Sequence, residues 1–588
     1  MDFFDLLTML GGLGLFLYGM KMMGDGLAQA SGGRLEKILE KLTSSRLKAL
    51  LVGAGVTAAI QSSSAVTVMV VGFVNSGIMK LEQAVGIIMG ANVGTTITAW
   101  ILGTAGISSE SFLIQLLNPT SFCPVLAIVG AAMLMFSHKD KHRHAATIML
   151  GFAILMFGMN TMSSTVKPLA EVPEFVNLLP RFSNPVLGML VGLLMSAILQ
   201  SSSVSVGILQ SLSMTGVISY GTAIPIILGE SIGACVPVLL SSIGARKNAK
   251  RTALIYLYFN LLGSVIFMAG FYGLNAVKPL AFVTQAATPF GIAAVHSLYK
   301  IIAAVCLFPC TKLMVKLVCL TVKDDPMMET GARDMTMSLL DPRFLEKPSY
   351  AVEQSRLVAI TMAGLAEQSM NIAMGLLKEY TDEEARKVKE LEEQVDRYED
   401  EIGSYLVKLS SRNLSEKDSH TLSTILHCIG DFERISDHSL NIMECAQEMY
   451  EKKLEFSDKA AKELEVFSRA VHDILNLAML SFREENLELA RQVEPLEEVI
   501  DGLNLDVKQR HIKRLRKGKC TIELGFVLSD ITTNYERVAD HCSNIAVCLL
   551  QVSEDEFDTH AYIDGLKAGN NMDFRGKVMA FGERYQLP

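Results

Sequence analysis

Two strings of one glutamine and three serines lie inside long apolar stretches of this 588-residue chain. They are Gln61, Ser62, Ser63 and Ser64 and, at an offset of 139, Gln200, Ser201, Ser202 and Ser203. Polar side chains at membrane depth are costly unless protein groups, water or a ligand satisfy them. Their hydroxyls and amides can donate to an oxyanion, and their oxygens can coordinate a hard cation such as sodium. Close helix packing explains one or two serines, but not the doubled string. We therefore expect a substrate or ion site at both strings.

A second element follows each string at the same offset. Gly90–Thr96 in the first copy corresponds to Gly229–Cys235 in the second. Glycine-mediated packing between helices is one interpretation of this element. The functional interpretation adds four side chains to the ion or substrate shell, namely Asn92, Thr95, Thr96 and Ser231. The second copy offers fewer or softer ligands than the first, so the two half-sites need not be equivalent.

Glu230 is the acidic residue that lies well inside an apolar span, and its counterpart in the first copy is Ala91. An ionisable residue in a membrane segment is a functional hypothesis by default. We favour a sodium ligand over a proton-titrating group. A structural carboxylate hydrogen-bonded to Ser231 is the competing interpretation. Because the apolar cores contain no arginine, cations bound beside an anion would have to offset its charge.

The polar half of the chain contains four Glu-x-x-x-Asp pairs, whose spacing places both carboxylates on one helix face. They are Glu392/Asp396, Glu433/Asp437, Glu497/Asp501 and Glu536/Asp540. Converging carboxylates favour hard or borderline cations, so we expect a divalent or iron-type metal at the Glu433 and Glu536 pairs. For the other two pairs a solvated charged face is an equal alternative. Arg434 and Arg537 also allow plain ion pairs, and we expect His438 and His541 to make interhelical contacts rather than to bind metal.

Composition divides the chain into a membrane domain, residues 1–320, and a charged helical part. The first carries 20 Lys and Arg against 11 Asp and Glu, and the remainder 33 against 51. A span needs about 20 apolar residues. By that measure we predict spans near 5–24, 83–103, 121–136, 145–165, 221–242, 252–273 and 290–318. No nucleophile with a neighbouring base and no phosphate-cradling glycine loop is present, so we expect no enzyme, and no nucleic-acid partner is indicated.

Two apolar segments, residues 48–77 and 186–217, do not fit as single spans. Each is about 30 residues long with the serine triplet near its middle, and arms of roughly 13 residues give about 20 Å of helix, less than the hydrocarbon thickness. We predict a re-entrant helical hairpin at each, since non-helical backbone at that depth must be buried in protein or line a cavity.

Basic residues in short loops set the orientation. If the clusters 34–48, 139–143 and 246–251 are cytoplasmic, residue 1 lies outside and the polar part inside. The two hairpins then enter from opposite faces. The fold class is therefore all-α, with a polytopic membrane domain of two inverted repeats, as in many secondary transporters. Repeat 1 covers about 1–137 and repeat 2 about 138–275, and 290–318 is an extra span.

The polar part repeats as well. Glu433-Arg434-x-x-Asp437-His438 recurs as Glu536-Arg537-x-x-Asp540-His541. After a linker over residues 321–349, we predict a cytosolic pair of three-helix bundles over 350–552, about 350–450 and 456–552. Residues 553–588 are a C-terminal tail to which no role is assigned.

The doubled QSSS strings, each followed by its glycine element, resemble the sodium/phosphate cotransporter family in its bacterial branch. The doubled ERxxDHxxNI motif resembles PhoU, a phosphate-signalling protein of two three-helix bundles with metal-binding carboxylates. The resemblance covers about 90% of the chain. It implies sodium-coupled movement of inorganic phosphate across the cell membrane, with phosphate and sodium shared by the QSSS groups and regulation by a cytoplasmic PhoU-like domain.

Two other functions remain open on this evidence. One is a phosphate-sensing membrane scaffold that binds without flux, and the other is a transporter of another oxyanion or organic anion. The direction of transport, the sodium count, the metal and the oligomeric state are also undetermined, as is a phosphate-signalling protein as partner.

Overall fold

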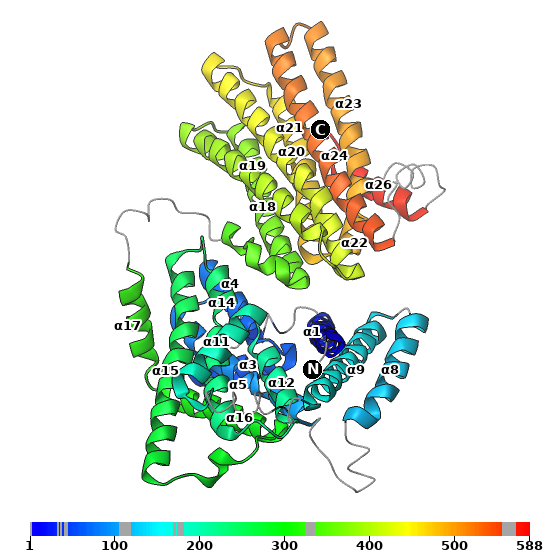
Figure 1. The fold of residues 1–588 in the computed structure, drawn as a ribbon. Coiled ribbons are helices and arrows are strands. Elements are labelled where there is room, and N and C mark those ends of the chain that lie inside the picture. The colour runs from blue at the N-terminus through cyan, green and yellow to red at the C-terminus, as the bar shows by residue number, and fades with distance from the viewer. Residues whose placement is uncertain are drawn as a thin grey trace. The chain divides into compact units, whose positions relative to one another are not determined.

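The computed structural model describes residues 3–31, 35, 38–39, 45–104, 119–137, 139–168, 172, 182–323, 336–554 and 572–588. They form two units, Met1–Ala332 and Arg333–Pro588, and within the described ranges both are built of helices (Figure 1). The expected all-α class is confirmed. Most of the basic cluster 34–48 and much of the linker lie outside the described residues.

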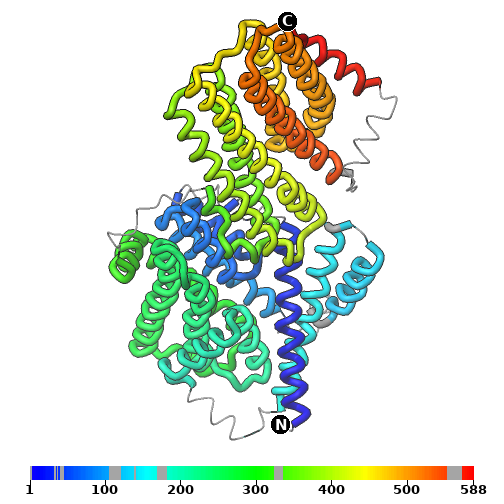
Figure 2. The backbone as a smooth tube through the Cα atoms, turned by 90° about the horizontal axis from the view of Figure 1, so that it is seen from above, coloured from blue at the N-terminus to red at the C-terminus, as the bar shows by residue number. Residues whose placement is uncertain are grey.

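The membrane unit contains six helical segments that are long and apolar enough to cross a bilayer within the described ranges. All described α-helices of this unit, the shorter ones included, can be followed in Figure 2 from blue to green. They are α1 (Phe3–Ser31), α3 (Arg46–Ile60), α4 (Ser63–Asn75), α5 (Leu81–Gly94), α6 (Thr96–Gly103), α8 (Pro119–Phe136), α9 (Asp140–Val166), α11 (Pro185–Leu199), α12 (Ser202–Ser213), α13 (Tyr220–Gly233), α14 (Val236–Ser241), α15 (Lys247–Val277), α16 (Pro289–Leu307) and α17 (Thr311–Thr321).

The two copies pack their helices through the same contacts. In repeat 1, a Cβ built on Gly90 of α5 would lie 1.9 Å from the carbonyl oxygen of Leu50 on α3. In repeat 2, a Cβ on Gly229 of α13 would lie 1.9 Å from the carbonyl oxygen of Met189 on α11. Both pairs of residues are related by the offset of 139. The glycine elements therefore let α3 and α11 approach their partner helices at backbone distance.

The helices α1 and α9 are also repeat counterparts, and they pack on each other in a reciprocal way. Gly12 faces Gly158, and Gly19 faces Gly151, where Gly151 and Gly158 are the counterparts of Gly12 and Gly19. Rising numbers on one helix meet falling numbers on the other, so the helices are antiparallel. Such an exchange of equivalent contacts is what a two-fold axis between the copies produces. An inverted repeat accounts for it directly.

The predicted span at 290–318 is longer than the helix found there, α16, which alone is long and apolar enough to cross a bilayer. The chain forms two helices there, because α16 ends at Leu307 and α17 begins at Thr311. Pro309 lies in the gap. Its ring clashes with the preceding helical turn, and its missing N–H removes a helical hydrogen bond. The start of α16 is fixed by Thr288, whose hydroxyl accepts from the Gly291 N–H at 3.0 Å.

The second unit contains two successive helical bundles, as expected. The first consists of α18 (Pro348–Leu376), α19 (Asp382–Ser410) and α20 (Glu416–Lys452). The second consists of α21 (Asp458–Glu484), α23 (Val493–Arg516) and α24 (Ile522–Glu554), with the four-residue α22 (Leu487–Ala490) before α23. The bundles join through α20 and α24, which pack on each other.

Both flanking segments of this unit fold onto it. The described end of the linker forms two short 3-10 helices, η5 (Met337–Leu339) and η6 (Pro342–Glu346), and Tyr405 of α19 donates to the Asp341 carbonyl at 3.0 Å. In the tail, α26 (Met572–Arg584) packs on α23, and Arg584 forms a 2.6 Å ion pair with Asp473. The described end of the tail, residues 572–588, is thus part of the second bundle.

Candidate functional site

Both QSSS strings break a helix in the same way. Gln61 ends α3 with φ 62°, and Gln200 ends α11 with φ 54°. The next residue is the N-cap of the following helix in each copy. Ser62 accepts from the Ala65 N–H at 3.2 Å, and Ser201 accepts from the Val204 N–H at 3.3 Å. Left-handed backbone is unfavourable for a residue with a Cβ and recurs at functional sites, so both breaks are candidate half-sites.

The side chains at the two breaks differ in their surroundings. Gln61 is buried and accepts a 2.8 Å hydrogen bond from Thr98, whereas Gln200 is exposed. Ser63 contacts the Tyr256 hydroxyl at 3.3 Å. The Oγ atoms of Ser62 and Ser64 lie 3.4 Å apart, and Ser202 and Ser203 are buried. The first break is therefore engaged with other helices through its side chains, while the second holds two buried hydroxyls and an exposed amide.

The hydroxyls of the glycine elements bond back to their own helices. Thr95 donates to the Ala91 carbonyl at 3.0 Å, and Ser231 to the Ile227 carbonyl at 3.1 Å; Thr96 does the same to Val93. Asn92 instead presents its side-chain oxygen to a different helix, as described next. Of the element's predicted ligands, Asn92 is the one whose oxygen already holds a cationic group.

A buried lysine that sequence reasoning missed lies between the repeats. Lys300 of α16 is 3% exposed, and its Nζ donates to the Oδ1 atoms of Asn92 and Asn260 at 2.7 Å each. The helix α16 contacts α5 and α6 of repeat 1 and α12 and α13 of repeat 2. The apolar cores contain no arginine, as the sequence indicated, but Lys300 places a basic side chain among them. The rule that singled out Glu230 would have found Lys300 in its apolar run.

Glu230 is completely buried, and neither of its carboxylate oxygens has a hydrogen-bond partner among the described residues. The competing interpretation, in which Ser231 bonds to this carboxylate, is not what the structure has, since Ser231 bonds to its own helix. His296, one turn before Lys300, is equally buried with both ring nitrogens unpartnered in the described part of the chain. Burying such groups is costly unless something else satisfies them.

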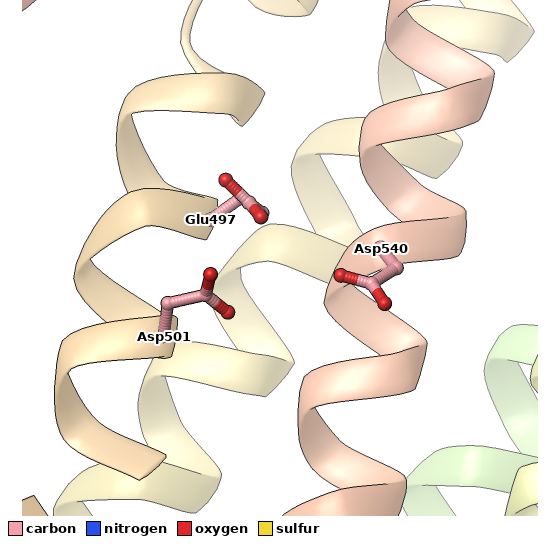
Figure 3. A group of neighbouring side chains, drawn as sticks. All are labelled: Glu497, Asp501 and Asp540. Carbon is pink, nitrogen blue, oxygen red and sulfur yellow. The ribbon is translucent and has the colours of Figure 1, made fainter. Parts of the chain in front are cut away.

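Three carboxylates converge in the second bundle. Glu497 and Asp501 of α23 and Asp540 of α24 have oxygens within 4.8 Å of one another, as Figure 3 shows. Glu497 and Asp540 border a pocket of about 300 Å³ that Glu494 and His541 also line. Glu536 points elsewhere and accepts a 2.6 Å hydrogen bond from Asn504. The Glu497/Asp501 pair, for which a solvated face was an equal alternative, thus provides two of the three gathered carboxylates.

The corresponding acidic residues of the first bundle lie near each other without forming such a group in the described structure. Burial, Asp437 and Asp396 raise the pKa of Glu392, and burial and Asp437 raise the pKa of Glu433. Arg434 lies 3.5 Å from both Glu433 and Asp437. The two bundles therefore differ, although their motifs match.

His438 and His541 make interhelical contacts, as expected. His438 bonds Asn534 and His541 bonds Asp431, each at 2.8 Å across the α20–α24 interface. All four residues obey the motif offset of 103, so these contacts are reciprocal, like those between α1 and α9. Burial and the second histidine lower the pKa of His438, against a smaller opposite effect of its bond to Asn534.

These features define a class: a helical membrane protein with an internally repeated core, fused to a repeated helical bundle. Residues 15–164 and 155–293 match the Na+/Pi-cotransporter family model, and residues 359–446 and 464–549 match the PhoU domain model. The membrane part of the chain is therefore built of Na+/Pi-cotransporter domains, and two PhoU domains follow it.

Three relatives illustrate the match. The chain is 23% identical to the "Putative inorganic phosphate export protein YjbB" of Salmonella typhimurium, over 95% of this chain and 99% of that one. It is 28% identical to PhoU homolog 1 of Thermotoga maritima, over 36% of this chain and 89% of that one. It is 37% identical to the sodium-dependent phosphate transport protein 2A of Rattus norvegicus, over 15% and 14% of the two chains.

Proposed function

We propose that the protein is a sodium-coupled secondary transporter of inorganic phosphate, regulated by its PhoU-like part in the cytoplasm. One observation carries the proposal most strongly: two helix breaks related by the repeat, each with a serine N-cap at the start of a new helix. Free N–H groups and the helix dipole make such a start favourable for an oxyanion.

The substrate site is proposed to include both QSSS strings, with Asn92, Thr95, Thr96 and Ser231 beside them. Hydroxyl and backbone donors suit phosphate oxygens, and hydroxyl and amide oxygens suit sodium. Glu230 is proposed as a sodium ligand, since a bound cation would satisfy a carboxylate that is buried without a partner. Sodium coupling is supported by the family description and by the rat relative's name.

The acidic cluster of Glu497, Asp501 and Asp540 is proposed to bind a divalent or iron-type cation, because three gathered carboxylates match the donors such ions take. Binding there would stabilise the second bundle and so let a cation bias the regulatory unit. Glu392, Asp396, Glu433 and Asp437 are proposed as a second, weaker cation site, and Glu536 as an outer group through Asn504.

Flux through purified protein in liposomes tests the proposal. Radiolabelled phosphate should move when sodium is imposed on one side, and choline in its place should give no flux. Reversing the sodium gradient should reverse the flux, because the gradients set its direction; the YjbB name favours export in the cell. Saturable phosphate binding without flux would instead favour a sensing scaffold, and equal competition by sulfate would favour a broader oxyanion transporter.

A further inference from the structure

The ammonium group of Lys300 is held as a cation is held in a binding site. Its two acceptors are amide oxygens from different helices, Asn92 on α5 and Asn260 on α15. Such oxygens are also ligands for hard cations. The nitrogen of Asn92 is committed to the Ile88 carbonyl at 3.0 Å and that of Asn260 to the Tyr256 carbonyl at 2.9 Å. Both oxygens are thereby fixed toward the same point, and Nζ lies there.

The position is buried, and no carboxylate pairs with it among the described residues. Lys300 is 3% exposed, Asn92 1% and Asn260 0%. Although Glu230 is also buried, the two residues do not form an ion pair with each other in the described structure. A buried charge held only by neutral groups is costly, and polar contacts to two oxygens and the nearby Tyr299 ring do not replace a counter-ion. A role beyond folding would account for its presence.

The position is connected to the first helix break. Asn260 lies one turn after Tyr256 on α15, and the Tyr256 hydroxyl contacts Ser63. The helix α16 follows both repeats, so Lys300 has no counterpart in them. In repeat 2 the residue equivalent to Asn92 is Ser231, whose hydroxyl bonds within its own helix, next to the unpartnered Glu230. In the described structure, Asn92 of repeat 1 thus binds the Lys300 ammonium, whereas Glu230 of repeat 2 is a carboxylate with no hydrogen-bond partner.

We propose that the Lys300 ammonium is a tethered cation that occupies the ion position of repeat 1, so that free sodium is needed at the repeat 2 half alone. The inference rests on the proposed sodium-coupled function for its biological meaning. It makes the two halves chemically unequal while their backbones remain equivalent. It also places a cationic side chain beside the first break, where an anionic substrate would otherwise need a second sodium ion.

Sodium binding to the purified full chain tests this inference. Equilibrium binding of radioactive sodium would be counted for the natural protein, Lys300→Ala and Lys300→Met. The alanine variant leaves the two amide oxygens facing a space that sodium and water can fill, so it should bind about one more sodium per chain. The methionine variant removes the charge but fills the space with an apolar chain, so it should bind the same number as the natural protein.

An unchanged count in Lys300→Ala would overturn the inference, and so would a gain in both variants, which would reflect lost charge and not a vacated position. If Lys300→Ala does not give a monodisperse protein, Lys300→Ser, which leaves the same space and adds a small hydroxyl ligand, should show the same gain. Sodium-independent phosphate flux in the natural protein would defeat the proposed function, while the sodium count of the variants would still decide whether Lys300 occupies an ion position.

Discussion

Glu230 and Lys300 are the residues at which burial and charge conflict most in the membrane unit. Both lie in helices apolar enough to span a bilayer, and both are less than 4% exposed. Sequence reasoning found the first because it is an acidic residue well inside an apolar span, where its counterpart in the other copy is Ala91. It missed the second because α16 lies outside the repeats and has no copy for comparison.

Replacing Glu230 by glutamine should separate the stability cost of burying its carboxylate from its proposed role as a sodium ligand. Without bound sodium, Glu230→Gln should unfold at a higher temperature than the natural protein, because a neutral amide is cheaper to bury than a carboxylate. Adding sodium chloride, compared with choline chloride, should stabilise the natural protein and leave the variant nearly unchanged. Glu82→Gln on the exposed face of α5 is the matched control. Sodium stabilisation that survives in Glu230→Gln would contradict the ligand role.

The first-bundle carboxylates give a prediction with a defined sign. Because the folded-state pKa of Glu433 lies above its usual value of 4.5, its charged form destabilises the fold, and this cost disappears as pH falls through the raised pKa toward 4.5. Glu433→Gln should therefore raise the unfolding temperature at pH 7, and the gain should shrink at lower pH.

The measurement is the difference in unfolding temperature between Glu433→Gln and the natural protein across pH 7 to 5, in metal-free buffer. Taking the difference removes the opposite effect of His438, whose lowered pKa weakens the fold as pH falls below its usual 6.5. Exposed Glu390→Gln serves as control. A gain that is constant over this range would show that the carboxylate charge is not the cause.

At the scale of elements, the repeat offset predicted most of what the structure has. The offset paired the two QSSS strings and the two glycine elements. The helix breaks at Gln61 and Gln200 were predicted from arm length, because hairpin arms too short to span a bilayer can be recognised from length alone. The offset did not predict the break between α16 and α17 at Pro309, because apolar residues continue on both sides of the proline. Nor could it predict that Glu497 and Asp501 join Asp540, because which helix faces meet depends on packing rather than spacing.

Close approach of α3 to α5 should make the glycine element intolerant of even a methyl group. Gly90→Ala and Gly229→Ala place a Cβ against a backbone oxygen, so each should cost about 1–3 kcal/mol of stability. Gly55→Ala on α3 meets nothing within 4 Å and should be neutral or slightly stabilising. Thermal unfolding of the three variants in detergent measures this. Equal stability of Gly90→Ala and Gly55→Ala would contradict the packing described for the repeat.

At the scale of the whole molecule, the tail and the linker illustrate the limit of reading from sequence. Neither has a repeat partner or a sustained apolar period, so no role could be assigned to residues 553–588. In the structure Arg584 and Tyr585 hold residues 572–588 against Asp473 of the second bundle. The 3-10 helix η6 packs against the first bundle. Single long-range polar contacts of this kind leave no pattern in one sequence.

The regulatory role predicts that a cation acts on flux through the PhoU-like part. Manganese added on the side of that part should change the rate of phosphate flux in the natural protein. Asp540→Asn removes one of the three gathered carboxylates and should abolish most of this effect while leaving the manganese-free rate unchanged. Glu523→Gln, on the exposed start of α24, should respond like the natural protein. A full response in Asp540→Asn would place the regulatory cation elsewhere.

The central claim is that both helix breaks belong to one phosphate path, and sodium-driven phosphate flux in liposomes tests it most directly. Ser62/Ser63→Ala and Ser202/Ser203→Ala should each reduce flux to the level of empty liposomes. Ser76→Ala, at the far end of α4, should keep it, because Ser76 bonds back to the Gly72 carbonyl of its own helix. Full flux in either of the paired variants would contradict the account.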